Sequence, residues 1–356
     1  IQNLEDFLAY LQQNGVEEGT VFFQGWACGP CRYGLYAPTQ TLTLDRAGYG
    51  PGRICSVHLF DVMRRFGLTF ALGVFDGMIV MDLLYKMLHR TRPYAVDPSS
   101  AEALYRRYAE RLYEELENFR FNPLRLADGA YLRPLERLVA EAAEEFGRLE
   151  KRDETRPLIL VGGEFYVRLD DRNNEQIIAK IEAAGGEACL APASELFSYT
   201  AYIWYREACD RHALRPTLPG YLLKSGYAAI NRLARRDEAR LEQAAAGLLH
   251  DLEEPGPEEI MERAGRYISS HYGGEPPMTI GRAAAIAQRS GAAGAVFVAP
   301  FTCMPGSYVE AQQGMLRQEL GLPVITVYYD GKENAGRDEM IEGLVFQARQ
   351  MLERRA

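Results

Sequence analysis

Residues 158–164 read Leu-Ile-Leu-Val-Gly-Gly-Glu, a short apolar run that ends in two glycines and a carboxylate. A run of this length, bounded by turn residues, is typical of a buried strand in a parallel sheet. Three further runs of the same kind follow, each separated from the one before by helical periodicity: 187–191 (EACLA), 295–299 (AVFVA) and 324–328 (VITVY). This alternation predicts an α/β fold in which helices cover both faces of a parallel sheet.

The chain before residue 158 predicts a second, smaller sheet. Residues 20–24 and 53–58 have the β-branched and aromatic character of strands. Most of the sequence between them and residue 158 has the spacing of long amphipathic helices, and a charged segment ends it. We therefore expect two Rossmann-like lobes with parallel sheets and large helical insertions: residues 1–152, with a helical excursion at 77–151, and residues 153–356.

Composition and charge exclude several classes of protein. Of the 356 residues, 47% are apolar and 25% charged, and no apolar run approaches the roughly 18 residues that a membrane helix needs. A net charge of −9 argues against nucleic acid as a partner. Residues 1–13 read as an amphipathic helix, not as a secretory leader. We expect a cytoplasmic protein with no membrane and no nucleic-acid partner.

The cysteines favour metal or redox chemistry over a disulfide framework. With no secretory segment to indicate an oxidising compartment, closely spaced cysteines beside Gly and Pro are more often ligands or redox groups. The chain has six of them: Cys28, Cys31, Cys55, Cys189, Cys209 and Cys303.

Two cysteine loops share one design. Cys28 and Cys31 follow the strand at 20–24, and Cys303 follows the strand at 295–299; in both loops Gly and Pro accompany a thiol directly before a helical stretch. A helix amino terminus stabilises a thiolate and lowers its pKa. Because loops at the carboxyl ends of parallel strands converge, we predict that thiols from the two lobes ligate an iron–sulfur cluster. Cys55, within the strand at 53–58, is a further candidate ligand.

Three other side chains are candidates for supporting roles. Arg32 follows Cys31 and is a candidate to offset the charge of a cluster, the alternative being an ordinary surface position. Glu164 and Tyr166 follow the strand at 158–161 and are candidates to supply a proton or orient a substrate. The alternative for Glu164 is a polar loop that caps the helix expected after Asp171.

A thiol–disulfide oxidoreductase is the competing interpretation. Cys28-Gly29-Pro30-Cys31, with Trp26 nearby, is similar to the redox site of thioredoxins. However, Ala27 separates Trp26 from the first cysteine, no Thr-Pro turn follows a later strand, and this interpretation leaves Cys303 without a role.

Several separated segments resemble one family. Residues 29–36 (GPCRYGLY) resemble the Gly-Pro-Cys-Arg-aromatic-Gly-Gln-Tyr motif of the 2-hydroxyacyl-CoA dehydratase and benzoyl-CoA reductase superfamily, in the branch related to the CoA-enzyme activase. Further segments are similar to the same branch, in the same order: 80–94 (VMDLLYKMLHRTRPY), 161–168 (VGGEFYVR), 184–199 (AGGEACLAPASELFSY), 300–306 (PFTCMPG) and 328–331 (YYDG). Cys31 and Cys303 occupy the positions of the family's cysteine motifs.

The resemblance implies an iron–sulfur component of an ATP-dependent, low-potential reductase or dehydratase. In such systems a cubane-type (4Fe-4S) cluster, or a double-cubane cluster in some members, receives single electrons from a separate ATP-hydrolysing activator. The resemblance also implies an anaerobic setting and a homo- or hetero-oligomer with a related subunit. The alternative within the same family is a non-catalytic subunit that scaffolds a cluster or docks the activator.

One family motif is missing from the sequence. Large members carry an earlier Cys-Phe-Pro-Ala-Lys segment, which does not occur here. Its thiol would come from a partner chain, from a segment upstream of Ile1, or from Cys28 or Cys55.

Overall fold

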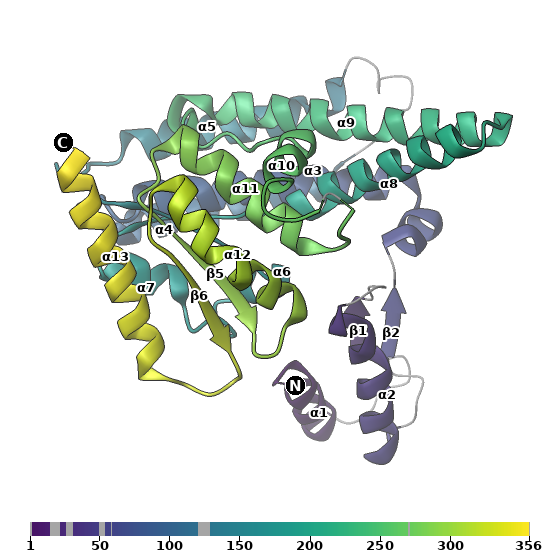
Figure 1. Cartoon of the computed structure of the whole chain (residues 1–356), viewed down its shortest axis with the longest axis horizontal. Coiled ribbons are helices and arrows are strands. Elements are labelled where there is room, and N and C mark those ends of the chain that lie inside the picture. Colours follow the sequence, from purple (N-terminus) through teal and green to yellow (C-terminus); the bar gives the residue numbers. More distant parts are fainter. Residues whose placement is uncertain are drawn as a thin grey trace.

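A computed structural model describes residues 2–14, 22–25, 31–49, 54–57, 59–119, 129–269 and 271–355. These residues form an α/β fold with one four-stranded and one two-stranded parallel sheet, surrounded by many helices (Figure 1). The predicted fold class is therefore confirmed.

The four-stranded sheet contains all four predicted strands of the second half of the chain. Its members are β3 (Leu158–Gly163), β4 (Glu187–Leu190), β5 (Gly294–Pro300) and β6 (Val324–Tyr329). All are parallel, in the order β4-β3-β5-β6. The chain continues outward from β3 to β4 on one side and from β5 to β6 on the other. The boundary between β3 and β5 is therefore the switch point at which open parallel sheets form ligand sites.

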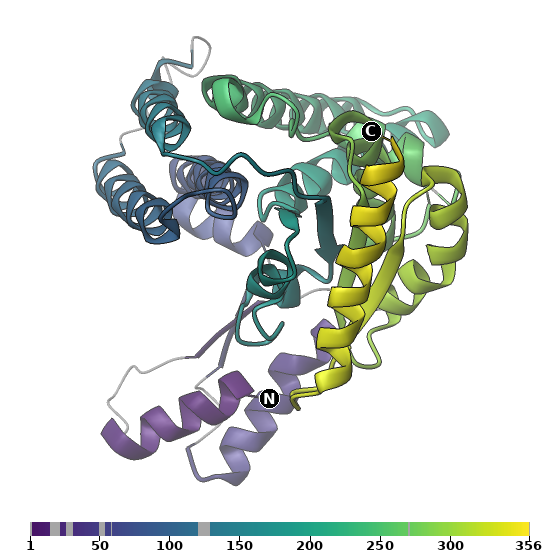
Figure 2. The same cartoon turned by 90° about the vertical axis from the view of Figure 1, so that its left-hand side faces the viewer.

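Alternate residues of the strands face two different layers of helices. Ile159 and Val161 pack with α7 (Ile177–Ala183) and α13 (Ala335–Arg355), which cover one face (Figure 2). Leu160 belongs to the opposite core, together with α11 (Glu275–Ser290) and α12 (Met304–Leu320). This period of two is the reason that continuous apolar runs become strands buried on both faces.

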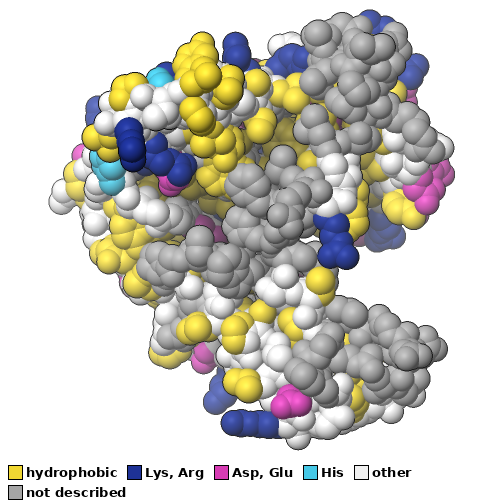
Figure 3. Space-filling view, turned by 90° about the vertical axis from the view of Figure 1, so that its right-hand side faces the viewer, with side chains coloured by type: hydrophobic (Ala, Val, Ile, Leu, Met, Phe, Trp, Pro, Cys, Tyr) yellow, Lys and Arg dark blue, Asp and Glu magenta, His cyan; other side chains and the backbone are white. Residues whose placement is uncertain are grey.

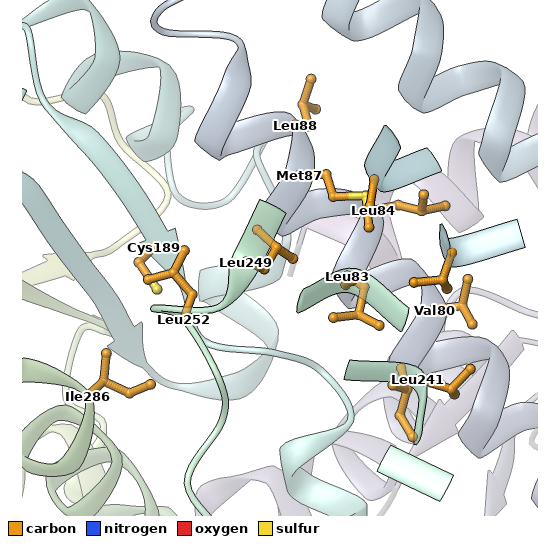
Figure 4. Packing of buried hydrophobic residues seen from close by; sticks show 14 of the residues in the cluster. Val80, Leu83, Leu84, Met87, Leu88, Cys189, Leu241, Leu249, Leu252 and Ile286 are labelled. Atoms are coloured by element: carbon orange, nitrogen blue, oxygen red, sulfur yellow. The ribbon is translucent and has the colours of Figure 1, made fainter. Parts of the chain in front are cut away.

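The largest core joins the sheet to a set of long helices. Its members on these helices come from α3 (Leu59–Thr91), α4 (Pro98–Glu117), α5 (Arg133–Arg148) and α9 (Leu218–Leu249). Phe197 of α8 (Glu195–Leu214) packs against this core, and α10 (Pro257–Ala264) contacts α11. Figure 4 shows Leu83 and Leu84 of α3 near Leu241 and Leu249 of α9, with Cys189 of β4 in the same cluster. Helices from both sides of the predicted boundary thus share one core, and the boundary at 152/153 stays a prediction.

Helix α3 begins at Leu59, well before the predicted start of the helical excursion at residue 77. Gly67, Gly73 and Gly77 interrupt the apolar pattern of this stretch, and glycine disfavours a helix. Gly77 lies where a Cβ would come within 2.8 Å of Leu116 Cδ1. Glycine therefore serves here to let α4 approach closely, and the helix continues through it. Gly67 has a φ of 82° and marks a kink.

The N-terminal part holds the small sheet. Strand β1 (Phe22–Gly25) pairs in parallel with β2 (Ile54–Val57), as the strand patterns predict. Helix α1 (Gln2–Asn14), the 3₁₀ turn η1 (Arg32–Leu35) and α2 (Tyr36–Arg46) accompany it, and the short elements η4 (Ala130–Leu132) and α6 (Phe165–Leu169) lie elsewhere in the fold. Across the described residues, no helix combines the length and the apolar character that a bilayer crossing requires.

The contact between β3 and β5 leaves no room for a side chain at residue 163. Gly163 has a φ of 113°, and a Cβ there would lie 2.1 Å from the carbonyl oxygen of Val298. We expect Gly163→Ala to lower the free energy of unfolding by about 3 kcal/mol through strain and overpacking. Gly147→Ala is the matched control, because it adds the same methyl to an exposed site in α5 and should stabilise by up to about 1 kcal/mol. Urea denaturation of both variants measures the difference, and equal effects would contradict the packing described here.

Candidate functional site

Cys303 begins α12 at the carboxyl end of β5. Its backbone is extended, and its Sγ accepts a hydrogen bond from the amide of Gly306 at 3.5 Å, so the sulfur caps the helix. The preceding residue, Thr302, has a φ of 65°, which is strained for a β-branched side chain. Gly306 completes the turn, since a Cβ there would come within 2.6 Å of Ala299. This short, strained connection fixes the thiol beside the switch point.

Cys31 has the same local geometry in the N-terminal part of the chain. It is the N-cap of η1, and its Sγ accepts from the amide of Tyr33 at 3.4 Å. Both thiols therefore lie directly before a helical turn, as the sequence predicts. Each is half-buried and unpaired with another cysteine.

The two thiols share one electrostatic environment, although they come from opposite ends of the chain. The charge of Cys31 raises the pKa of Cys303, and the carboxyls of Glu164 and Glu275 act on both thiols. Tyr33 belongs to the same group. Burial is the largest cause of the raised pKa of its phenol, and Glu164 and Cys31 add to the rise. Cys31 and Glu164 are thus near enough to Cys303 to affect its ionisation, while the roles of these residues at a metal site stay predictions.

Two carboxyl groups, those of Glu164 and Glu275, act on both thiols of this site. Glu164 caps α6 and accepts from the amide of Val167 at 2.8 Å, and Glu275 opens α11 and accepts from the amide of Phe165 at 3.3 Å. Burial raises the pKa of Glu164, with backbone hydrogen bonds and Arg168 opposing the rise. Burial also raises the pKa of Glu275 to about 7, with Glu164 adding to the effect. Glu164 therefore does cap a helix, as the alternative interpretation expects, but this helix is α6 and not a later one.

The expected lowering of the thiol pKa values is wrong. Burial raises the pKa of Cys303 to about 11; the Gly306 amide opposes this rise, and Glu164 and Glu275 add to it. The pKa of Cys31 is raised for the same reasons. The helix amino termini are present, but desolvation and neighbouring carboxyls outweigh them. Without a cation at the site, both sulfurs are protonated thiols at neutral pH.

A buried chain of ion pairs begins next to the carboxyls of Glu164 and Glu275, with Arg168 lowering the pKa of both. The guanidinium of Arg168 is fully buried, lies 2.6 Å from Glu195, and donates to the carbonyls of Gly163 and Pro192. Arg282 lies 3.7 Å from the same Glu195. It thereby continues the chain inward from the strand ends.

The inner end of the chain is equally buried. Arg282 donates to both oxygens of Glu254 at 2.7 Å, and the ammonium of Lys86 lies 2.6 Å from Glu254. Burial would raise the pKa of Glu254, but Arg282 and Lys86 outweigh it and hold the value at about 2. Cations buried this deeply need such partners, and removing one is costly.

The remaining predicted site residues do not all join the group. Tyr166 is 42% exposed, and its hydroxyl accepts from Asn173 at 3.4 Å, on the turn after α6. Cys55 is exposed on β2, in register with Phe23. Arg32 opens η1, and only its backbone is described. Cys28 lies outside the described residues.

Sequence reasoning missed Glu275 and Arg168. Glu275 stands in Gly-Gly-Glu-Pro-Pro, where acidic residues before proline are typical of a helix start, so a signal existed. Arg168 belongs to the segment that resembles the family, but nothing in its spacing indicates burial.

The surroundings of the thiols are open and apolar. Leu35 is 63% exposed and Phe301 65%, and Tyr36, Met304 and Tyr308 are also exposed. Apolar side chains left open beside polar groups are characteristic of binding surfaces. A small cavity of about 10 Å³ lies further inside, lined by residues that include Glu164, Glu275 and Gly306.

The described residues would supply only two ligands of the predicted metal centre. Among the described residues, no group of three or more His, Cys, Asp and Glu side chains is arranged to hold a metal ion. Cys31 and Cys303 provide two sulfurs whose amide hydrogen bonds suit a cluster thiolate. The other ligands would come from Cys28, from Cys55 after a movement of β2, or from a partner chain.

Comparison with protein-family models, with curated proteins and with solved structures gives no match for this chain.

The reactivity of the thiols tests the raised pKa values. With a pKa of about 11 in place of 9.0, Cys303 has roughly a hundredfold less thiolate at pH 8 than an ordinary cysteine. We expect iodoacetamide to alkylate Cys303 correspondingly slowly in the metal-free protein, and Glu275→Gln to speed it where Glu275 is ionised. Peptide mass spectrometry between pH 7 and 10, with the urea-unfolded chain as reference, measures this. A native rate equal to the unfolded rate would contradict the assignment.

Glu275 also predicts a pH dependence of stability. The folded protein binds this proton more tightly than the unfolded chain, because the pKa rises from 4.5 to about 7. The resulting stabilisation is complete below pH 4.5 and is lost as the pH rises towards 7. The wild-type protein should lose about 3 kcal/mol of unfolding free energy over this range through Glu275.

The matched variants isolate this contribution. Glu275→Gln keeps an oxygen for the Phe165 amide but cannot ionise, so it should lack this pH dependence. Glu342→Gln, at an exposed position of α13, should follow the wild-type protein. Denaturation series at pH 5 and pH 8 make the comparison, and parallel curves for all three proteins would rule out a buried, shifted Glu275.

Proposed function

We propose that this chain is an iron–sulfur component of an ATP-dependent, low-potential reductase or dehydratase. The cluster would be held between the lobes by Cys31 and Cys303, with Cys28 and Cys55 as further ligands. The main observation behind this proposal is that Cys31 adds to the rise in the pKa of Cys303, although these two helix-capping thiols come from distant parts of the chain. The ordered family motifs support the same conclusion.

Charge balance supports a metal centre more than a free thiol pair. Two thiols and two carboxyls converge beside one buried cation, Arg168, which is already paired with Glu195. Bound metal supplies positive charge and deprotonates a coordinating thiol outright. A site that keeps its sulfurs neutral until metal arrives suits such a ligand set.

A bound cluster would supply single-electron transfer, and the protein would supply the rest. Amide donors from Tyr33 and Gly306 would tune the potential by hydrogen bonding to the sulfurs. Glu275, with a pKa of about 7, and its neighbour Glu164 would hold a proton for the group being reduced. Tyr166 would contribute at the exposed rim, and Arg32 would add positive charge if its side chain faces the sulfurs.

Electrons would come from a separate ATP-hydrolysing activator. The exposed apolar side chains around Leu35 and Phe301 offer such a partner, or an apolar substrate, a surface beside the thiols. Exposed low-potential clusters and free thiols persist in a reducing, anaerobic cytoplasm, which is the setting this proposal implies.

Two alternative functions can be distinguished from this proposal by experiment. A non-catalytic subunit would bind the same cluster and dock the activator without turnover. A thiol–disulfide oxidoreductase would use Cys28 as nucleophile; the raised pKa of Cys31 gives no activated thiolate at the second position of that motif. A fully ligated cluster would favour electron relay, whereas an iron left open by a missing thiolate would favour catalysis.

Iron analysis tests the proposal directly. Protein purified or reconstituted without oxygen should contain iron and acid-labile sulfide and give an electron paramagnetic resonance signal when reduced. Cys31→Ala and Cys303→Ala should each lose most of the iron. Cys209→Ala, a half-buried cysteine of α8, is the matched control and should keep it. Wild-type protein that stays colourless and iron-free would refute the cluster and favour the thiol–disulfide alternative.

Turnover separates the first two classes. An iron-loaded protein that reduces or dehydrates a substrate with activator and ATP is a catalytic component. One that only accepts electrons is a relay.

A further inference from the structure

Helices α8 and α9 form a hairpin whose far end lies beyond the core. The first 13 residues of α9, 218–230, include no buried residue, and its buried side chains begin at Asn231. In α8, the last buried residue is Ala208. The free part of α9 is therefore about 20 Å long, and Figure 1 shows the hairpin extending past the rest of the molecule.

The end of this hairpin is apolar and is held by a helix cap. Five large side chains, here called the tip patch, are between 46% and 87% exposed: Leu214, Leu218, Tyr221, Leu222 and Leu223. Thr217 caps α9 by accepting from the amide of Gly220 at 3.2 Å, and the ring of His212 lies 6.1 Å from that of Tyr221. A patch that is already ordered pays little conformational entropy on binding.

Basic residues outnumber acidic ones along the hairpin that carries the tip patch. Figure 3 views the end of the molecule towards which the hairpin projects, and it shows hydrophobic side chains beside Lys and Arg in its upper part. Between residues 203 and 232 the chain has five basic residues against the acidic Glu207 and Asp210: Arg206, Arg211, Arg215, Lys224 and Arg232. The chain as a whole carries −9, so the hairpin has the opposite sign to the rest of the protein. An acidic partner surface with an apolar centre would fit it.

Helix α4 carries such a surface. Glu110, Tyr113, Glu114 and Glu117 are exposed and recur at the spacing of a single helix face, with Tyr113 64% exposed. We call these four residues the acidic stripe. The stripe lies in the C-terminal half of α4, where the helix dipole adds negative potential.

We propose that the tip patch of one copy of this chain docks on the acidic stripe of a second copy. In the arrangement that we propose, the contact is made twice about a two-fold axis, so that each copy gives its tip patch and its acidic stripe to the other. Leu218 and Leu222 supply the buried centre of each contact, and Arg215 and Lys224 pair with Glu110 and Glu114. This dimer requires no iron and stands independently of the proposed function.

Charge reversal tests the contact in both directions. Arg215→Glu with Lys224→Glu should abolish dimerisation, and so should Glu110→Lys with Glu114→Lys. An equimolar mixture of the two double variants should form dimers again, because both of its contacts then join opposite charges. Sedimentation equilibrium of the full chain measures the masses, and high salt should weaken the wild-type dimer.

Apolar variants complete the test. Leu218→Ser with Leu222→Ser should be monomeric and should not be rescued by either charge variant. Leu42→Ser is the control, since Leu42 is 58% exposed on α2, outside both surfaces. Circular dichroism melts establish that each variant is folded. A monomeric wild-type chain, a dimer that survives the charge reversals, or a mixture that stays monomeric would each overturn the proposal.

Discussion

The direct pairing of β3 with β5 determines where the chemistry of this protein can lie. Their register brings Gly163 opposite Val298, and the amide of Glu164 donates to the carbonyl of Val298 at 2.7 Å. The loops after the two strands therefore leave the sheet side by side, one with Glu164 and the other with Cys303. Helix α11 starts at the same edge and adds Glu275. Without this pairing, these groups would belong to separate loops.

The electrostatics of the site follow from its burial. Four acidic groups meet where the only nearby buried cation, among the described residues, is the already paired Arg168. Because acidic groups outnumber cations here, the pKa values of the thiols and of Glu275 are raised and these groups retain their protons more readily. The cationic core of an iron–sulfur cluster would replace the thiol protons at the sulfurs, and the carboxyl protons would then remain as a source for reduction chemistry. The same grouping of two thiols and two carboxyls thus explains the raised pKa values and would suit the proposed cofactor.

Much of the fold and part of the site could be predicted from the sequence. The apolar runs at 158–161 and 295–299 identify strands because they are short, are bounded by turn residues and suit a sheet buried on both faces. Cys31 and Cys303 stand out because Gly and Pro beside a thiol indicate a helix start. The pKa direction could not be predicted, since it depends on burial and on carboxyls from distant segments. Glu275 was missed because it does not follow a predicted strand; it opens α11, which precedes β5.

The meeting of Cys31 and Cys303 is the claim on which the functional account depends. Cross-linking the metal-free protein with a short bifunctional thiol reagent such as bismaleimidoethane, followed by peptide mass spectrometry, measures it directly. The account predicts a cross-linked peptide pair that contains Cys31 and Cys303. Cross-links that join Cys303 only to other positions, or that never include it while it reacts with single-armed maleimide, would contradict the account.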